Sequence, residues 1–404
     1  MLTLICFSIN NWEKRKARKQ QFMLSLAKRQ DVAKVVYVEP ALNLWRLIFS
    51  PGEELKDKGN QRRWLRALRF SYELAPEVQK LIILTPIFFL PFAFRLPFIY
   101  QLNLYLWLKF IRRKLKGLGF KEVILWLYNP YDFKLLSWFR QRCLAIFDWA
   151  EDWPEYFRDY PKRLREFLSR AQLQCIKEAD LVFTVSVHLL KQAKVINPNT
   201  WLLRDGTNWE YFVKPKLYYT PADLKDIPHP ILGYVGTVSF RFDAALVLAL
   251  SQRLVYASIV IIGKILTLTP EIRLLQERKN VYFLGEKDYS ELGGYLNNFD
   301  VCILPYLTEV KTPAPTKIYD YLASGKPIVS TSILELGFLS DYIWMARNYD
   351  EFTGFCVQAL KENNAVKQRL RIEKAQENSW DKRADEIMEF VRNLLVKKGI
   401  EAKI

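Results

Sequence analysis

A lysine at the start of a short predicted helix is the clearest candidate for chemistry in this 404-residue chain. Thr316 can cap a helix that begins at Lys317. Gly325 can take the left-handed conformation that ends such a helix, and Pro327 prevents its continuation, so we expect the helix over residues 317–324. Free N–H groups and the helix dipole favour an anion at a helix start, and Lys317 adds a full positive charge. This pattern predicts a phosphate site.

A carboxylate lies one helical turn after this lysine. Because of that spacing, Asp320 and Lys317 are expected on the same face of the helix. A carboxylate in such a place suits sugar hydroxyls better than phosphate, as the acidic residue on the ribose does in dinucleotide sites. An ordinary amphipathic helix with an exposed Lys–Asp pair is the alternative interpretation of the same spacing.

A second loop predicts a related function in the same part of the chain. A strand is expected at residues 231–238, and Gly236 and Thr237 lie near its end, with Arg241 shortly after. Glycine lets the backbone approach a ligand, and arginine is well suited to phosphate. Since this loop and Lys317 leave the same carboxyl edge of one predicted sheet, the two signals support each other.

An acidic cluster marks the front half of the chain. Asp148, Glu151 and Asp152 directly follow an apolar stretch at residues 144–147 that is predicted to be a strand. Acidic residues at the carboxyl end of a strand in an open α/β sheet face the ligand crevice, where a carboxylate can act as a general base. A solvated acidic turn is the alternative.

The elements around these residues indicate two α/β domains. The chain is longer than one hydrophobic core usually supports. Residues 1–214 alternate short apolar runs with helical patterns and lack a glycine-rich phosphate fingerprint after the first strand. A proline-containing polar stretch at 215–230 is the predicted linker, and regular strand–helix alternation over 231–378 predicts a second parallel sheet. Residues 379–404 are predicted to form an amphipathic final helix.

The charge of the chain lies almost entirely in its front half. The net charge is +17, and residues 1–214 hold 36 Lys and Arg against 20 Asp and Glu. This excess suggests a polyanionic neighbour, either nucleic acid, an anionic membrane surface or a charged acceptor. No reading helix, zinc module or RNA-binding aromatic motif is recognisable, so nucleic acid is not expected. The two histidines and five scattered cysteines predict neither a metal site nor disulfides.

The most apolar segments do not predict a membrane-spanning helix. Residues 81–100 contain several prolines and Arg95, which suit a bilayer helix poorly. Residues 98–115 read as an aromatic-rich helix followed by a basic end, which fits either a helix lying on a membrane or a core helix with a solvated end. No secretory signal is recognisable at the start. We therefore expect a cytoplasmic protein that can associate peripherally with the inner face of the membrane.

Several motifs together resemble those of the GT-B glycosyltransferases, in particular family 4-like enzymes that build bacterial polysaccharides, of the teichuronic acid biosynthesis type. In the second domain they are Gly233-Tyr-Val-Gly236-Thr-Val, Asn280-Val-Tyr-Phe-Leu-Gly285, Phe299-Asp-Val-Cys-Ile-Leu-Pro305 and the stretch from Pro315 to Pro327. The front domain is similar more loosely, through Trp12, Arg18, Thr85-Pro86, Tyr128-Asn-Pro130 and the turn at Asp148.

The resemblance implies an α/β GT-B fold with two Rossmann-like domains facing a cleft and a C-terminal helix that crosses back to the first domain. It implies transfer of a sugar, with retention and without a bound metal, from a nucleoside diphosphate sugar on the second domain. The acceptor would be a glycan or lipid-linked molecule of cell-surface polysaccharide synthesis, bound on the first domain. Trp12 and Arg18 are the acceptor residues that it suggests.

The same resemblance assigns roles on the donor side. It places Lys317 on the diphosphate, with the start of its helix at Thr316, and it places Asp320 on the ribose. Gly236, Thr237 and Arg241 would lie beneath the donor, because they occupy the positions of the family's residues there. Two positions differ from common members of the family. Glu is frequent at the position of Asp320, and many members have Glu at the position of Thr312, where it lies against the transferred sugar.

Two other functions fit parts of the pattern. A nucleotide-sugar epimerase can share the GT-B architecture, and it would convert a free nucleotide sugar without any acceptor. A non-catalytic protein could use the basic front domain to bind membrane or nucleic acid, and it would show salt-sensitive binding without affinity for nucleotide sugars.

Overall fold

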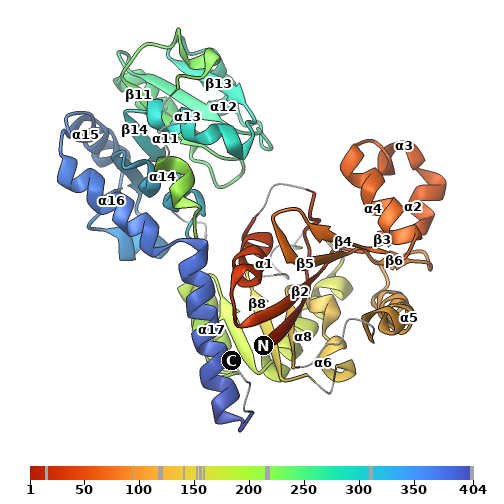
Figure 1. Ribbon diagram of the computed structural model, residues 1–404. Helices are drawn as coiled ribbons and strands as arrows, with labels where there is room; N and C mark the ends of the chain where they lie inside the picture. The colour runs from red at the N-terminus through yellow and green to blue at the C-terminus, as the bar shows by residue number, and fades with distance from the viewer. Residues whose placement is uncertain are drawn as a thin grey trace. The chain divides into compact units, whose positions relative to one another are not determined.

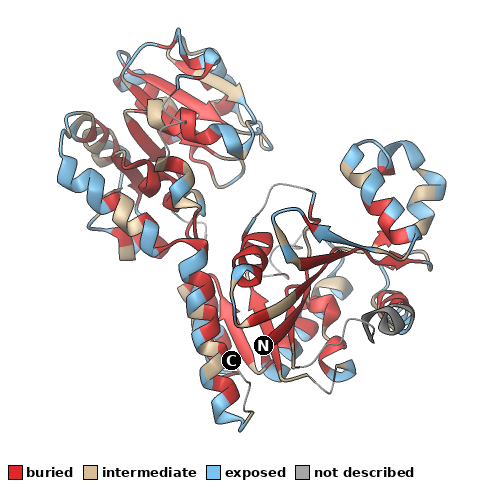
Figure 2. Cartoon of the chain, viewed as in Figure 1, coloured by how far each residue is buried: buried red, intermediate tan, exposed pale blue. Residues whose placement is uncertain are grey.

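The computed structural model describes residues 1–13, 17–93, 95–116, 122–139, 142–151, 153, 157, 160–213, 219–308 and 313–400. The chain forms two compact units, each built on its own sheet (Figure 1). Unit 1 consists of Met1–Arg204 and Trp380–Ile404, and unit 2 consists of Asp205–Ser379. Figure 2 shows that the strands at the centre of each unit are buried.

The sheet of unit 1 has eight strands in the order β10-β9-β8-β7-β1-β2-β5-β4. All neighbouring strands are parallel except β4 and β5, which are antiparallel at one edge. Continuous apolar runs form the central strands because helices cover both faces. The strands are β1 (Leu2–Phe7), β2 (Val32–Val38), β4 (Tyr72–Ala75), β5 (Val78–Leu84), β7 (Val123–Leu127), β8 (Leu144–Trp149), β9 (Leu181–Thr184) and β10 (Thr200–Leu202).

The last helix of the chain belongs to unit 1. The helix α17 (Trp380–Lys397) packs beside α1 (Arg18–Lys28) on one face of the first sheet (Figure 1). The Trp380 ring meets the Phe22 ring edge to face, with 5.2 Å between the centroids. Helices α5 (Pro97–Lys116), α6 (Leu135–Trp138), α8 (Lys162–Glu178) and α9 (Val187–Lys194) also belong to unit 1. The predicted return of the C-terminal helix to the first domain is confirmed.

A small helical insertion follows β2 in unit 1. The short strands β3 (Leu42–Asn43) and β6 (Ile87–Phe88) pair, and between them in the chain lie α2 (Leu44–Phe49), α3 (Pro51–Glu54) and α4 (Lys58–Leu68). Side-chain caps begin two of these helices, since Asn43 accepts from the Trp45 N–H and Asp57 accepts from the Asn60 N–H. Trp64 fills the small core of the insertion.

Unit 2 has a fully parallel sheet of six strands in the order β13-β12-β11-β14-β15-β16. The order reverses between β11 and β14, and in doubly wound folds ligands bind at such a switch point. The strands are β11 (Ile231–Val235), β12 (Ser258–Ile262), β13 (Val281–Gly285), β14 (Val301–Leu304), β15 (Ile328–Thr331) and β16 (Trp344–Ala346). The helices are α10 (Trp209–Val213), α11 (Ala244–Arg253), α12 (Pro270–Gln276), α13 (Leu292–Asn298), α14 (Lys317–Ser324), α15 (Tyr349–Leu360) and α16 (Ala365–Glu377). The parallel second sheet is as predicted.

The boundary between the units lies earlier than the stretch 215–230 that the sequence suggests as a linker. Unit 2 already begins at Asp205, and α10 packs against α14 within it. The described part of the stretch, residues 219–230, belongs to unit 2 because Leu224 and Ile227 are buried in its core. Proline and polar residues therefore mark an approach to β11 here, and the chain passes between units at Arg204–Asp205 and again at Ser379–Trp380.

No helix in the described part of the chain is long and apolar enough to cross a membrane.

Candidate functional site

The helix that carries Lys317 forms as its local signals predict. α14 spans Lys317–Ser324, and Gly325 follows it in the left-handed conformation with φ 71°. The role of Thr316 differs from the prediction, because its backbone is already helical and its side chain makes no cap hydrogen bond. The Thr316 hydroxyl instead donates to the Asp205 carboxylate. The start of α14 is thus tied to the first residue of unit 2.

Lys317 holds its ammonium group over aromatic rings. The Lys317 Nζ lies 3.0 Å from the Tyr234 hydroxyl oxygen and 4.2 Å from the centroid of the Tyr234 ring, with the Tyr306 ring centroid at 5.4 Å. Among the residues that the structure describes, no carboxylate forms an ion pair with this ammonium. Aromatic faces hold a cation without neutralising it. The charge at the start of α14 therefore remains available to an anion.

Gly236 makes the space that this ammonium occupies. A Cβ atom built on Gly236 would lie 1.7 Å from the Lys317 Nζ, and Gly236 has a φ of +150°, which side-chain-bearing residues rarely adopt. Gly263, after β12, permits a close approach as well, since its Cβ would lie 2.2 Å from the Gly236 carbonyl oxygen. The structure thus brings Gly236 and Lys317 together where the strand order of the sheet reverses.

Thr237 and Arg241 follow on the same loop. Thr237 is exposed, and its carbonyl accepts a hydrogen bond of 3.0 Å from the Tyr234 hydroxyl. The Arg241 carbonyl accepts from the Leu307 N–H at 2.9 Å, which joins this loop to the segment after β14. The Arg241 Nε is buried and has no hydrogen-bond partner among the described residues. A partly buried guanidinium with free donors suits a phosphate.

Asp320 is buried, which excludes the exposed Lys–Asp pair that spacing alone allows. Its Oδ1 accepts from the Thr207 hydroxyl at 2.7 Å and from the Tyr289 hydroxyl at 3.1 Å. The Tyr289 ring stacks on Tyr211, with 5.9 Å between the centroids. Hydroxyl groups of this chain therefore surround the carboxylate that the resemblance assigns to the ribose.

Two predicted site residues of unit 1 form a buried ion pair. The Arg18 Nη2 lies 3.0 Å from the Asp148 Oδ1, and the Arg18 Nε donates to the Asp148 Oδ2 at 3.3 Å. The Asp148 side chain is fully buried, and the Arg18 side chain is 7% exposed. Both oxygens of this carboxylate are thus engaged by one guanidinium. The pair orients α1 against β8 where β8 ends.

Of the other two acidic candidates, the structure describes only Glu151. Glu151 is half-buried just after β8. Asp152 and Thr312 lie outside the described residues. In the described part of the chain, no group of three or more metal-ligating side chains lies together, and the five cysteines are free.

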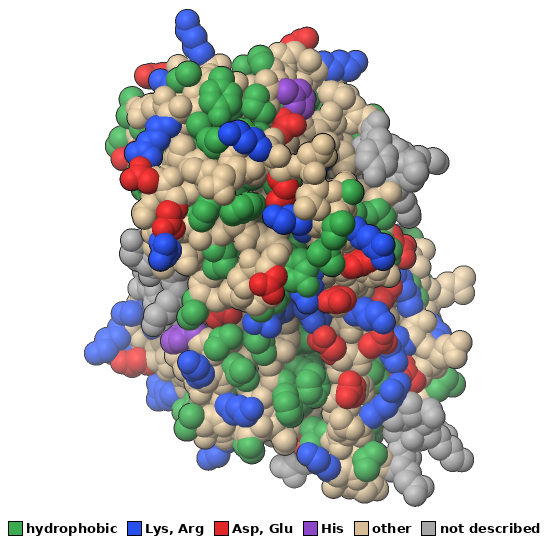
Figure 3. Space-filling model, turned by 90° about the vertical axis from the view of Figure 1, so that its left-hand side faces the viewer, with side chains coloured by type: hydrophobic (Ala, Val, Ile, Leu, Met, Phe, Trp, Pro, Cys, Tyr) green, Lys and Arg blue, Asp and Glu red, His purple; other side chains and the backbone are tan. Residues whose placement is uncertain are grey.

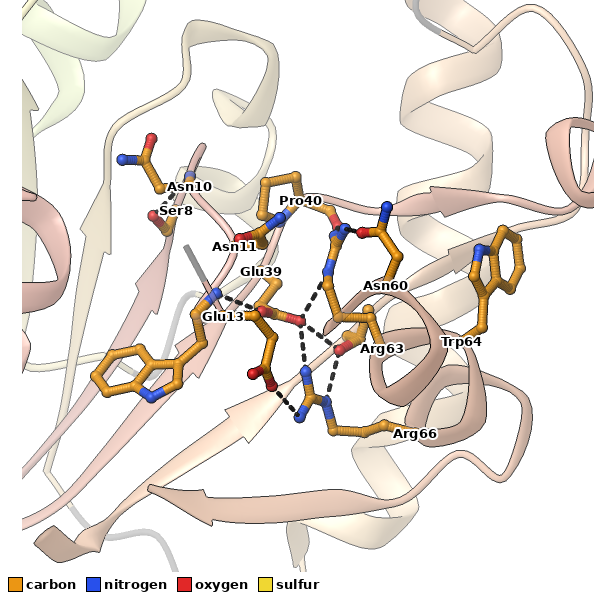
Figure 4. Close-up of polar contacts among 12 residues, drawn as sticks. Ser8, Asn10, Asn11, Glu13, Glu39, Pro40, Asn60, Arg63, Trp64 and Arg66 are labelled. Atoms are coloured by element: carbon orange, nitrogen blue, oxygen red, sulfur yellow. Dashed lines mark hydrogen bonds and ion pairs between the residues drawn. The ribbon is translucent and has the colours of Figure 1, made fainter. Parts of the chain in front are cut away.

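Glu39 is a polar centre in unit 1 that the sequence analysis misses (Figure 4). It directly follows β2, and its Oε1 accepts from the Trp12 N–H at 2.5 Å. Its Oε2 accepts from Arg63 at 3.3 Å, from Arg66 at 2.9 Å and from the Thr85 hydroxyl at 2.5 Å. The available signal was the same one used for Asp148, an acidic residue at the end of a buried strand. Glu39 fixes the Trp12 loop to the helical insertion.

Asp132 is a second buried carboxyl group that sequence reasoning does not single out. It ends the short 3-10 helix η1 (Pro130–Asp132) after β7 and accepts a hydrogen bond of 2.7 Å from the Tyr100 hydroxyl. Burial raises the pKa of this carboxyl from 3.8 to about 7, although the Tyr100 hydrogen bond acts in the opposite direction. Asp132 is therefore placed to make the stability of unit 1 depend on pH.

We expect Asp132→Asn to remove this dependence. Between pH 4 and pH 7 the unfolded chain has lost a proton that the folded chain keeps, so the free energy of unfolding falls as the pH rises, by roughly 4 kcal/mol in total for this pKa shift. The asparagine variant can still accept from Tyr100 and should melt higher than wild type at pH 8 but not at pH 4. Melting curves across this range test it, with the exposed Asp341→Asn as control. If the melting temperatures of wild type and Asp132→Asn depended on pH to the same extent, the prediction would be wrong.

Comparisons with known proteins show which proteins this chain resembles. Residues 229–360 match the family model described as Glycosyl transferases group 1. The putative teichuronic acid biosynthesis glycosyltransferase TuaH of Bacillus subtilis (strain 168) is 23% identical over 283 residues, which cover 66% of this chain and 71% of TuaH. The region that matches the family model, residues 229–360, contains β11, the loop at Gly236 and α14.

Solved structures share the fold of both units. Sucrose-phosphate synthase from Thermosynechococcus elongatus has a TM-score of 0.67 at 16% identity and covers 98% of this chain and 100% of that one. Anabaena Alr3699/HepE in complex with UDP has a TM-score of 0.66 at 12% identity and covers 97% of this chain and 100% of that one. At such identities the likeness shows the fold alone. Residues 229–360, within unit 2, thus match the group 1 glycosyltransferases, and the chain has the GT-B fold of its structural neighbours.

Proposed function

We propose that this nucleotide-sugar glycosyltransferase transfers its sugar to a glycan or lipid-linked acceptor of cell-surface polysaccharide synthesis. The observation that carries the proposal is the Lys317 ammonium, held over Tyr234 and in the space above Gly236, at the switch point of the second sheet. The relationship to TuaH, which is named for teichuronic acid biosynthesis, supports the polysaccharide context. The Anabaena neighbour was solved with UDP and with UDP-glucose, which supports a uridine diphosphate sugar as the donor.

On the donor side, the chemistry is stabilisation of a leaving diphosphate. Negative charge grows on the diphosphate as the bond to the sugar breaks. Lys317, the helix start at Thr316 and the free donors of Arg241 would stabilise that charge without moving. Asp320, held by Thr207 and Tyr289, would accept hydrogen bonds from ribose hydroxyls. Gly236 and Thr237 would provide backbone that the donor can approach.

On the acceptor side, the buried Arg18–Asp148 ion pair suggests different roles for the three predicted acidic residues. Asp148 accepts two hydrogen bonds from Arg18, so we assign it a positioning role. Glu151 is half-buried after the same strand, and it or Asp152 suits a general base on the acceptor hydroxyl better than Asp148 does. Trp12, whose backbone is held by Glu39, would contact the acceptor.

A thermal-shift screen of nucleoside diphosphates and their sugars tests the proposal directly. Ligand that binds only the folded state stabilises it, by about 2.7 kcal/mol at a hundred times the dissociation constant. We expect UDP and a UDP-sugar to raise the melting temperature of wild type and to raise that of Lys317→Ala much less. Release of UDP only when an acceptor glycan is present would separate transfer from epimerisation. No shift with any nucleotide, or conversion of a free nucleotide sugar to its epimer, would contradict the proposal.

A further inference from the structure

The helix α5 is apolar on two opposite faces. Its inner face packs into unit 1 through Asn103, Leu104 and Trp107, which are all buried. Its outer face carries large apolar side chains at positions i, i+4, i+7 and i+8, which are 68%, 45%, 42% and 41% exposed: Phe98, Leu102, Tyr105 and Leu106. A surface helix of a globular domain normally has a polar outer face. The outer face of α5 therefore suits an apolar environment.

Polar contacts join α5 to α2 through the segment after β6. The Asn103 side-chain carbonyl accepts from the Phe89 N–H at 2.8 Å and from the Leu90 N–H at 2.9 Å. The Trp45 ring N–H donates to the Phe89 carbonyl at 2.8 Å, and the 74% exposed Phe49 stacks on Trp45. These contacts connect two exposed apolar helices in one assembly. We call its exposed side chains the aromatic surface: Trp45, Phe49, Phe92, Phe98, Leu102 and Tyr105.

The segment that contains α5 carries charge of one sign. Residues 86–116, which include all of α5, contain six Lys and Arg and no Asp or Glu. One of the six, Lys109, is exposed one turn after Tyr105, and its Nζ lies 5.1 Å from the Tyr105 ring centroid. On the face drawn in Figure 3, by contrast, basic and acidic side chains are interspersed. The α5 part of the aromatic surface thus lies in a basic segment without acidic residues, whereas beside α2 the exposed Arg46 pairs with Glu54 at 2.8 Å.

We propose that the aromatic surface binds an anionic lipid bilayer, with α5 lying in the plane of the interface. Phenylalanine and leucine side chains enter the acyl boundary, tyrosine and tryptophan rings sit at the level of the headgroups, and lysine and arginine contact lipid phosphates. A nucleic acid would meet the same cations, but it offers no apolar phase for the exposed Phe49, Phe98 and Leu102. This inference goes beyond sugar transfer, since it assigns a lipid partner and uses none of the donor residues.

Vesicle co-sedimentation of the full chain tests the proposal. We expect wild type to bind vesicles of 70% phosphatidylcholine and 30% phosphatidylserine, and to bind pure phosphatidylcholine vesicles at least tenfold more weakly. The double variant Phe98→Glu and Leu102→Glu should lose binding to both. Lys109→Glu should weaken binding to the anionic vesicles by roughly tenfold. One cation near such a membrane strengthens binding by roughly fivefold, and this substitution both removes a cation and adds an anion.

Two control variants test whether the loss of vesicle binding is specific to the aromatic surface. Val195→Glu and Val366→Glu place the same charge at side chains that are 89% and 67% exposed elsewhere, and they should bind vesicles as wild type does. The UDP-induced thermal shift should be unchanged in every variant, which shows that the variants are folded. Equal vesicle binding by wild type and the Phe98/Leu102 variant would overturn the proposal. Wild-type self-association that this variant abolishes, without vesicle binding, would overturn it in favour of a second copy of the chain.

Discussion

Lys317→Ala should lower the rate of sugar transfer by about a hundredfold to a thousandfold, the loss typical for removing one group that stabilises charge in a transition state. The Lys317 ammonium is positioned by Tyr234 and lies where the diphosphate is proposed to bind, so its removal leaves the growing charge without its nearest cation. Because Lys317 is also expected to bind the diphosphate of the free donor, the loss should appear in kcat/KM, and the part that arises only as the bond breaks should appear in kcat. Steady-state kinetics with a UDP-sugar measure it.

Two further variants interpret that result. Lys326→Ala removes the same charge just beyond the other end of α14 and should change the rate little. Lys317→Arg keeps the charge, but a guanidinium is larger than the space above Gly236, so the rate should not recover fully. Wild-type rates in Lys317→Ala with every donor that binds would show that this residue has no role in transfer.

Glu39→Ala should reduce the free energy of unfolding of unit 1 by about 3–5 kcal/mol, the usual cost of leaving a buried charge without its partner. The Glu39 carboxylate accepts from two arginines, a hydroxyl and the Trp12 N–H, and both guanidinium groups are less than a tenth exposed. Denaturant unfolding followed by tryptophan fluorescence measures the loss. Since two units can unfold in separate steps, the transition that the variant moves identifies unit 1.

The control for this prediction lies on the rim of the same cluster. Glu73 pairs with Arg66 from a side chain that is 48% exposed, so Glu73→Ala should cost less than about 1 kcal/mol. Glu39→Gln keeps an acceptor for the Trp12 N–H and the Thr85 hydroxyl, and it should fall between the two. If Glu39→Ala proved no more costly than Glu73→Ala, the cluster would not hold the insertion as described.

Local signals predict the elements around Lys317 well because they act over a few residues. Gly325 and Pro327 end α14 where expected, and the placement of Gly236 beside Lys317 follows from the rule that loops at the carboxyl edge of a parallel sheet meet. The side-chain partners could not be predicted in this way. The Thr316 hydroxyl donates to Asp205, which is 111 residues away in the sequence. Local signals favour a helix cap at Thr316, and only the folded chain brings the competing carboxylate close.

Unit 1 shows the same contrast between local signals and distant side-chain partners more strongly. Asp148 lies inside β8, which extends to Trp149, whereas the sequence predicts it just after the strand. Its ion pair with Arg18 spans 130 residues and could not be predicted from local signals. The insertion between β2 and β5 is built from helices of four to eleven residues, too short for a clear apolar period. Its link to the Trp12 loop runs through Glu39, a single residue without a motif.

The position of α17 has a consequence for the order in which the chain can acquire its structure during synthesis. Unit 2 is continuous from Asp205 to Ser379, so all of its core is available before the last residues are made. Unit 1 starts first but lacks Trp380, Ile387, Met388 and Val391, which cover Phe22 and its neighbours, until all of unit 2 has been synthesised. The N-terminal half of the protein therefore leaves the ribosome first and finishes folding last, with one apolar face open to chaperones in the interval.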